Sequence, residues 1–326
     1  MTGLFKSNNP TSVFFLLIYA IALKFPLFIN ALPPISQASD AFFYKIILHV
    51  IKPVSATIPF IYNLLTFLLI FIQAIYFNRV ANAQHLHKQA NYLYAMSYLL
   101  ITSLLANWFS FSAVLITSTM AIWIWSKLCT LYNSAMPKTT IFNIGLATGI
   151  ATLTCTPFII FLIWIMVGIG IARPFRIQEW LIGLAGMLTP LYIIIAFLFI
   201  TDKIGQYNMP AISFYLPRTW PAAPQLFNIV LLVFTTGIGI FYVINNMRRQ
   251  LVLTRKSWQL LFLFSTIALL LLFINNSNTG ANSYLLALPV AAIVSAVFYY
   301  PQKKIVPIFF HVSMVLAYLF NFFISK

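Results

Sequence analysis

The sequence predicts an all-α, polytopic membrane protein that forms a single integral membrane domain over residues 1–326. Of the 326 residues, 62% are hydrophobic and 7% are charged, whereas a soluble domain is about 25% charged. Apolar runs of about 18 residues or more recur, and each could cross a hydrocarbon layer as a helix. The alternating patterns of an outer-membrane β-barrel are absent. These observations favour a helical membrane protein over a soluble one.

Eleven hydrophobic segments are expected to span the membrane. The region 141–172 could be one long tilted helix, but Pro157 follows a polar stretch and favours two short helices. Trp108, in the tight turn of "LLANWFS", is expected at the membrane interface. The predicted spans are 11–31, 57–77, 92–106, 108–126, 141–154, 157–172, 179–200, 226–246, 258–275, 284–299 and 305–324.

The distribution of charge predicts that the N-terminus lies inside and the C-terminus outside. Cytoplasmic loops of membrane proteins are enriched in Lys and Arg. On this topology the outer side holds five cations, which are Lys45, Lys52, Lys203, Arg218 and Lys326. The inner side holds thirteen, which are Lys6, Arg79, Lys88, Lys127, Lys138, Arg173, Arg176, Arg248, Arg249, Arg255, Lys256, Lys303 and Lys304. We therefore attribute the net charge of +16 to orientation and anionic lipid, and expect no nucleic-acid partner.

The N-terminal segment has the shape of a signal peptide, because an apolar run follows Lys6. Lys24 and the pair Pro33-Pro34 favour an uncleaved signal anchor, although cleavage after "SQAS" is the alternative. Lys24 lies inside the first span, where it could extend to the interface or reach a lipid phosphate, and we favour the former. The positions and spacing of Cys129 and Cys155 favour neither a disulfide nor a metal site.

Asp40 is one of three acidic residues in the chain and is expected in the first outer loop. The apolar residues at 43, 46, 47, 50, 51 and 54 are spaced as on one face of a helix, opposite Lys45, His49 and Lys52. This pattern predicts an amphipathic helix on the outer membrane surface. Either Ser39 or Asp40 caps this helix, or the Asp40 carboxylate takes part in proton transfer.

The second long outer loop, 201–225, contains four prolines and is expected to be a connector or a lid. Lys203 and Arg218 could bind phosphate in it. Alternatively, the loop is an interfacial anchor that uses Tyr215 and Trp220.

The string "RPFRIQEW", residues 173–180, predicts a cytoplasmic clamp formed by Arg173, Arg176 and Glu179. Arg176 and Glu179 are three residues apart and are expected to pair on one helix face. Gly145-x-x-x-Gly149 and Gly183-x-x-Gly186 predict close helix packing.

The segments "NIGLATGIATLTCTPFII" and "IARPFRIQEWLIGLAGMLTP" resemble a family of uncharacterised polytopic inner-membrane proteins of Bacteroidota. This resemblance implies the bacterial inner membrane. The layout of spans also resembles the GT-C-type glycosyltransferases that use polyprenyl-phosphate sugars, in which an acidic residue of the first outer loop leads into surface helices. The resemblance maps that residue onto Asp40. The chain departs from the pattern because it has no paired acids there and no outer domain.

Three hypotheses follow. The first is a transferase of this type that acts on a lipid-linked sugar in envelope glycan assembly. In it, Asp40 acts as base or holds a divalent ion, while Lys45, Lys52, Lys203 and Arg218 contact the phosphate. The second is a non-enzymatic scaffold or lipid-handling protein. The third and most distant is a transporter, which the scarcity of ionisable residues within the spans disfavours.

Overall fold

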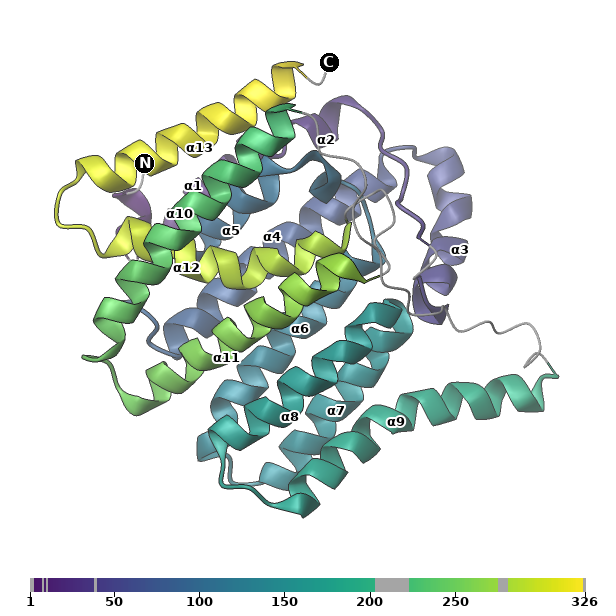
Figure 1. The fold of residues 1–326 in the computed structure, drawn as a ribbon. Helices are drawn as coiled ribbons and strands as arrows, with labels where there is room; N and C mark the ends of the chain where they lie inside the picture. Colours follow the sequence, from purple (N-terminus) through teal and green to yellow (C-terminus); the bar gives the residue numbers. More distant parts are fainter. Residues whose placement is uncertain are drawn as a thin grey trace.

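The computed structural model of the protein describes residues 3–7, 9, 11–37, 40–202, 223–274 and 281–324. Within these ranges the secondary structure is helical, as predicted (Figure 1). The α-helices are α1 (Thr11–Leu23), α2 (Pro26–Ile29), α3 (Phe42–Thr57), α4 (Ile61–Ala83), α5 (Leu93–Leu104), α6 (Ala113–Thr130), α7 (Pro137–Thr154), α8 (Phe161–Ala172), α9 (Ile177–Ile200), α10 (Ala223–Met247), α11 (Val252–Leu270), α12 (Ala287–Tyr299) and α13 (Ile305–Ile324). Short 3₁₀ helices are η1 (Leu4–Lys6), η2 (Ala106–Phe109), η3 (Leu131–Asn133), η4 (Thr156–Ile160), η6 (Leu271–Phe273) and η7 (Ala281–Leu286).

Seven helical segments in the described ranges are long and apolar enough to cross a membrane, which supports a multi-pass membrane protein. They are Ile61–Ala83, Ala113–Asn133, Ile177–Ile200, Ala223–Met247, Val252–Phe273, Ala281–Tyr299 and Ile305–Phe322. Thr11–Leu23, Leu93–Leu104 and Thr156–Ala172 are shorter apolar helices. Each of the eleven predicted spans overlaps a helix, but eleven crossings and the orientation of the termini remain predictions.

The region 141–172 forms two helices, as the position of Pro157 predicted. Helix α7 ends at Thr154, and Cys155 has the extended conformation φ −138°, ψ 106°. The 3₁₀ helix η4 then begins at Thr156 and leads into α8. Pro157 is the second residue of η4 and has no backbone N–H with which to continue α7, so the chain changes direction at this polar break.

Glycines bring α7 and α9 into backbone contact, which confirms the predicted close packing. A side chain at Gly145 would overlap the carbonyl oxygen of Gly183, and one at Gly186 would overlap that of Phe142. Such small residues let helix backbones approach closely in membranes. Beyond this interface α9 extends away from the other helices (Figure 1).

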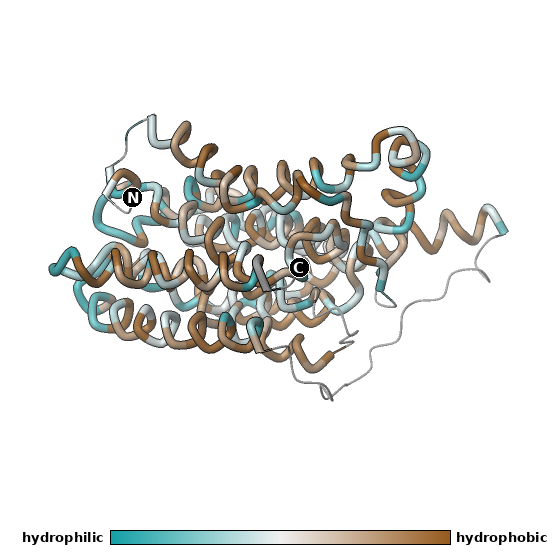
Figure 2. The backbone as a smooth tube through the Cα atoms, turned by 90° about the horizontal axis from the view of Figure 1, so that it is seen from above, coloured by the Kyte–Doolittle hydropathy of each residue, from teal (hydrophilic) through white to brown (hydrophobic). Residues whose placement is uncertain are grey.

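Burial is uneven among the helices. In the window containing α12, 89% of the residues are buried inside the protein, compared with 22% for α10. Figure 2 shows that the helices are largely hydrophobic and that hydrophilic residues gather in turns. The exposed apolar surface of α9 and α10 is the surface expected of lipid-facing helices.

Hydrogen bonds join several turns into one end of the molecule. Lys6 Nζ donates to the carbonyl of Tyr299 at 3.2 Å, and Thr254 Oγ1 donates to that of Gln84 at 3.2 Å. We call this the basic end, defined by residues 3–7, 83–92, 130–140, 172–179, 247–256 and 299–305. The α3 end is defined by residues 24–37, 40–57, 104–112 and 154–156. These two ends hold the candidate sites.

Candidate functional site

Asp40 lies in a buried turn before α3 and does not cap that helix. The N-cap residue of α3 is Ala41, and it makes no side-chain capping bond. The Asp40 carboxylate instead accepts a hydrogen bond from the backbone N–H of Gln37, and the Asp40 N–H donates to the Gln37 carbonyl at 3.1 Å. The prediction that Asp40 caps the helix is therefore wrong, and Ser39 lies outside the described residues.

The same turn is attached to the break between α7 and η4. Asp40 and Cys155 form an isolated antiparallel bridge, and the Ala41 N–H donates to the carbonyl of Thr154 at 3.2 Å. The Thr156 hydroxyl beside this bridge is buried and has no hydrogen-bond partner among the described residues. Asp40 therefore lies at a polar interruption of the apolar helices.

Burial changes the acidity of Asp40, whose exposed fraction is 2%. Loss of solvation raises the pKa of this carboxyl to about 6, while the Gln37 N–H and the charge of Lys45 act in the opposite direction. A carboxyl with this pKa can take up or release a proton near neutral pH, as general acid–base catalysis requires. Buried structural carboxyls show the same shift, so the pKa alone assigns no catalytic role.

Helix α3 presents three different faces. Its protein-facing side is anchored by Tyr44, whose hydroxyl donates to the carbonyls of Ile35 and Phe111. The apolar residues that were predicted as one stripe divide into two groups. Ile47 and Ile51, together with Leu48, pack against the core. Ile46, Val50 and Val54 are exposed, with 42%, 64% and 43% of their surface accessible.

The third face of α3 is cationic, as predicted. Lys45, His49 and Lys52 are exposed and follow one another at helical spacing. With 3.6 residues per turn, this face lies between the protein-facing side and the exposed apolar side. An amphipathic helix of this kind suits the boundary between acyl chains and headgroups.

Most of the second predicted outer loop, residues 203–222, lies outside the described residues. Lys203 and Arg218, like Tyr215 and Trp220, lie outside the described residues. Asp202, just before them, is exposed and has a left-handed backbone with φ 52°.

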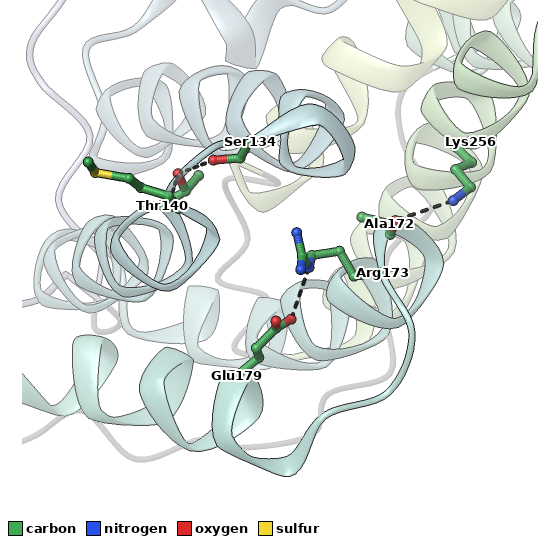
Figure 3. Close-up of polar contacts among 7 residues, drawn as sticks. Ser134, Thr140, Ala172, Arg173, Glu179 and Lys256 are labelled. Carbon is green, nitrogen blue, oxygen red and sulfur yellow. Dashed lines mark hydrogen bonds and ion pairs between the residues drawn. The ribbon is translucent and has the colours of Figure 1, made fainter.

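At the basic end, Glu179 pairs with Arg173 rather than with Arg176 (Figure 3). The Arg173 Nε and Glu179 Oε2 atoms are 3.3 Å apart, and the two side chains are 19% and 3% exposed. Arg176 is the N-cap of α9, has an extended backbone and is exposed. The predicted Arg176–Glu179 pair is wrong because the three-residue spacing brings side chains together only when both residues are helical.

Two side chains predicted at the interface are buried. Lys24 is 0% exposed, donates to the Thr102 carbonyl at 2.7 Å, and lies 4.4 Å from the centre of the Phe109 ring. Trp108 is 3% exposed and its indole N–H donates to Ser283 at 2.9 Å. Extension of Lys24 to the interface is therefore wrong. The position of Lys24 inside an apolar run marked it as an unusual residue. The sequence did not reveal that the Thr102 carbonyl would be its hydrogen-bond partner.

In the described part of the chain, no three His, Cys, Asp or Glu side chains are grouped so that they could hold an ion. His87 is instead stacked between Tyr94 and Tyr299, with ring centres 4.4 and 4.2 Å away. Burial lowers the pKa of His87 to about 3, so it is neutral at physiological pH.

No protein-family model matches the chain, and no curated protein or solved structure matches it either.

Proposed function

We propose that the protein binds the phosphate of a membrane lipid or lipid-linked molecule at the α3 end, in the bacterial inner membrane. The observation that carries this proposal is the three-faced helix α3. Ile46, Val50 and Val54 offer an apolar surface for acyl chains, and Lys45 and Lys52 are exposed beside them. A Lys or Arg held near the membrane surface attracts anionic headgroups, and each such cation contributes about 1 kcal/mol to the free energy of binding.

In its enzymatic form, the proposal is a GT-C-like glycosyltransferase that uses a lipid-linked sugar phosphate at the outer face of the membrane. The acceptor hydroxyl oxygen attacks the anomeric carbon of the sugar, and its proton passes to the Asp40 carboxylate. The bond between that carbon and the phosphate oxygen breaks, and the phosphate leaves on its lipid carrier. Lys45 and Lys52, with Lys203 and Arg218, stabilise the charge on the leaving phosphate.

A non-enzymatic lipid-handling or scaffold role is the second candidate. It is favoured by the burial of Asp40 and by the use of its carboxylate in the turn with Gln37. In this role Asp40 fixes the connection between α3 and the break at Cys155, and only the cationic face of α3 meets lipid.

Phosphate binding is tested with a double substitution, Lys45→Gln with Lys52→Gln. We expect this variant to bind a polyprenyl phosphate in mixed micelles about 10- to 30-fold more weakly, because two cations are lost. Lys88→Gln with Lys304→Gln removes two exposed cations from the basic end and serves as the matched control. Equal binding by the wild-type chain and both variants would refute the proposal.

The Asp40→Asn variant distinguishes the glycosyltransferase from the lipid-handling role. It keeps the shape of the side chain and removes the carboxylate. A deletion strain is complemented with this variant, protein level is checked by blot, and surface glycans are profiled. Loss of a glycan at normal protein level supports the transferase. Full rescue by Asp40→Asn, with failure of the double lysine variant, supports lipid handling.

A further inference from the structure

A small pocket lies beside the α3 end, between the segment that contains α2, the 3₁₀ helix η2 and the last turns of α13. Figure 1 shows the C-terminal end of α13 close to α2. The pocket has a volume of about 220 Å³, which is below the range of about 300–1,000 Å³ for drug-sized ligands. It therefore has room for one small ring. Asn30, Ser103, Tyr318 and Asn321 supply its polar lining, and the rest is apolar.

Two polar side chains of α13 line the pocket with hydrogen-bonding groups to spare. Tyr318 and Asn321 are 6% and 8% exposed. The Tyr318 hydroxyl makes no hydrogen bond with any residue in the described ranges. Asn321 donates one N–H to the Leu104 carbonyl at 3.4 Å, which leaves its second N–H and its side-chain oxygen. Polar groups buried this deeply are normally hydrogen-bonded, so these two side chains indicate a ligand that supplies the missing partners.

Asn63 of α4 holds one wall of the pocket in place. Its side-chain nitrogen donates to the carbonyls of Leu27 and Asn30 at 2.7 and 2.6 Å, and its oxygen accepts from the Leu32 N–H at 3.0 Å. Because Asn63 is buried, these bonds fix the wall against α4. They leave the exposed Asn30 side chain unused, and it has no other partner among the described residues. A wall that is ordered before binding lowers the entropic cost of binding.

The polar groups of the lining match a neutral polyhydroxyl ligand. The amides of Asn30 and Asn321 and the hydroxyl of Tyr318 can each donate and accept, as each hydroxyl of a sugar does. The Ser103 hydroxyl already donates to the Leu99 carbonyl at 2.7 Å, so it offers an acceptor only. None of the described lining residues is an acid, a lysine, an arginine or a histidine. The lining therefore favours a neutral ligand over an ion.

Aromatic rings supply much of the apolar lining. Phe109, Tyr318 and Phe322 border the pocket, and the C–H groups of a sugar ring pack on such rings through dispersion and weak contacts with the π electrons. Lys24 lies 4.4 Å from the centre of the Phe109 ring, but it donates to the Thr102 carbonyl and is not part of the lining. A sugar ring uses both the hydrogen-bonding groups and the aromatic surface within this volume.

We propose that this pocket binds a single sugar ring, presented by a free hexoside or by a lipid-linked sugar. On the predicted topology the C-terminal end of α13 lies at the outer face, on the same side as α3. The proposal goes beyond phosphate binding by α3, because none of the lining residues belongs to that helix. Either proposal can therefore fail without the other.

The test is equilibrium binding to the full-length protein in a detergent that has no sugar headgroup. The probes are radiolabelled methyl glucoside, galactoside and mannoside, and polyprenyl-phosphate hexoses in mixed micelles with bare polyprenyl phosphate as the reference. Saturable binding of a methyl hexoside identifies a free sugar as the ligand. Tighter binding of a sugar-bearing lipid than of the bare phosphate, without hexoside binding, identifies a lipid-linked sugar. Equal binding of both lipids without hexoside binding refutes the sugar pocket and leaves phosphate binding by α3 intact.

Tyr318→Phe should weaken binding of the responsive probe by about 2- to 10-fold, because one neutral hydrogen bond is lost and the ring stays. Ala106→Leu adds bulk at an exposed lining residue and should weaken binding by at least about 10-fold. Tyr192→Phe removes an exposed hydroxyl from α9 and, as the matched control, should leave binding unchanged. Thermal midpoints verify that each variant is folded. Unchanged binding by both pocket variants, or an equal loss in Tyr192→Phe, would overturn the proposal.

Discussion

The two ends of the molecule hold their charged groups in different ways. At the α3 end, Asp40 and Lys24 are buried individually, and each is held by hydrogen bonds to the backbone. At the basic end, cations are spread over several turns, and Arg173 pairs with Glu179. A buried group without an opposite charge has a shifted pKa or a special function, whereas surface cations mainly set orientation and attract anions. The scarce acids of this chain therefore have different roles.

Glu179→Gln should have the largest effect on stability. It leaves the partly buried Arg173 without its carboxylate, which costs about 3 kcal/mol in the free energy of unfolding. The measurement is denaturant unfolding of the protein in detergent micelles. Arg176→Gln alters an exposed cation in the same turn and should change stability by less than about 0.5 kcal/mol. If Arg176→Gln proved the more damaging, the pairing in Figure 3 would be contradicted.

Asp40→Asn should have a smaller effect that depends on pH. Because folding raises the pKa of Asp40 from 3.8 to about 6, ionisation is penalised in the folded state. The contribution of Asp40 to stability is therefore largest below pH 4 and is lost as the pH rises towards 6 and above. The variant should be more stable than wild type by about 2–3 kcal/mol at pH 7.5 and no more stable at pH 4.

Thermal midpoints of the two proteins at both pH values make this comparison. Asp202→Asn is the matched control, because Asp202 is exposed and its left-handed backbone accommodates asparagine. A constant difference between Asp40→Asn and wild type across the pH range would contradict the burial of an ionisable carboxylate at this position.

The double variant Lys45→Gln, Lys52→Gln should have the smallest effect on stability, less than about 0.5 kcal/mol in neutral detergent. Both side chains are exposed and project from α3 without a described ion pair. Unfolding measured in neutral detergent and again with an anionic lipid separates folding from binding. A large loss in neutral detergent would show that these lysines belong to the core of the α3 end rather than to a lipid-facing surface.

Much of the fold was predictable because the relevant signals are local in the sequence. Each predicted span overlaps a helix, since an apolar run must satisfy its backbone hydrogen bonds within the segment. Pro157 marked the break between α7 and η4, and the glycines of α7 and α9 marked a close interface. The amphipathic pattern of residues 43–54 corresponds to α3.

The candidate sites were less predictable because burial and partners depend on residues distant in the chain. Asp40 meets Cys155, which is more than a hundred residues away, and no local pattern links them. A polar cavity beside Lys127 is lined by residues of four helices, α4, α6, α7 and α11, and of the turns between them. Even the short Arg173–Glu179 pair depends on where α9 begins, which a three-residue spacing did not reveal.

Hydropathy and charge act residue by residue, so the sequence alone predicts a helical membrane protein with its cations concentrated in particular turns. The packing of the helices determined which charged groups are buried and which are exposed. It placed Lys24 beneath the Phe109 ring and Asp40 beside a helix break. It also divided the apolar stripe of α3 between protein and exterior. The physical reason is that solvation is a property of the packed surroundings, which only the arrangement of all the helices supplies.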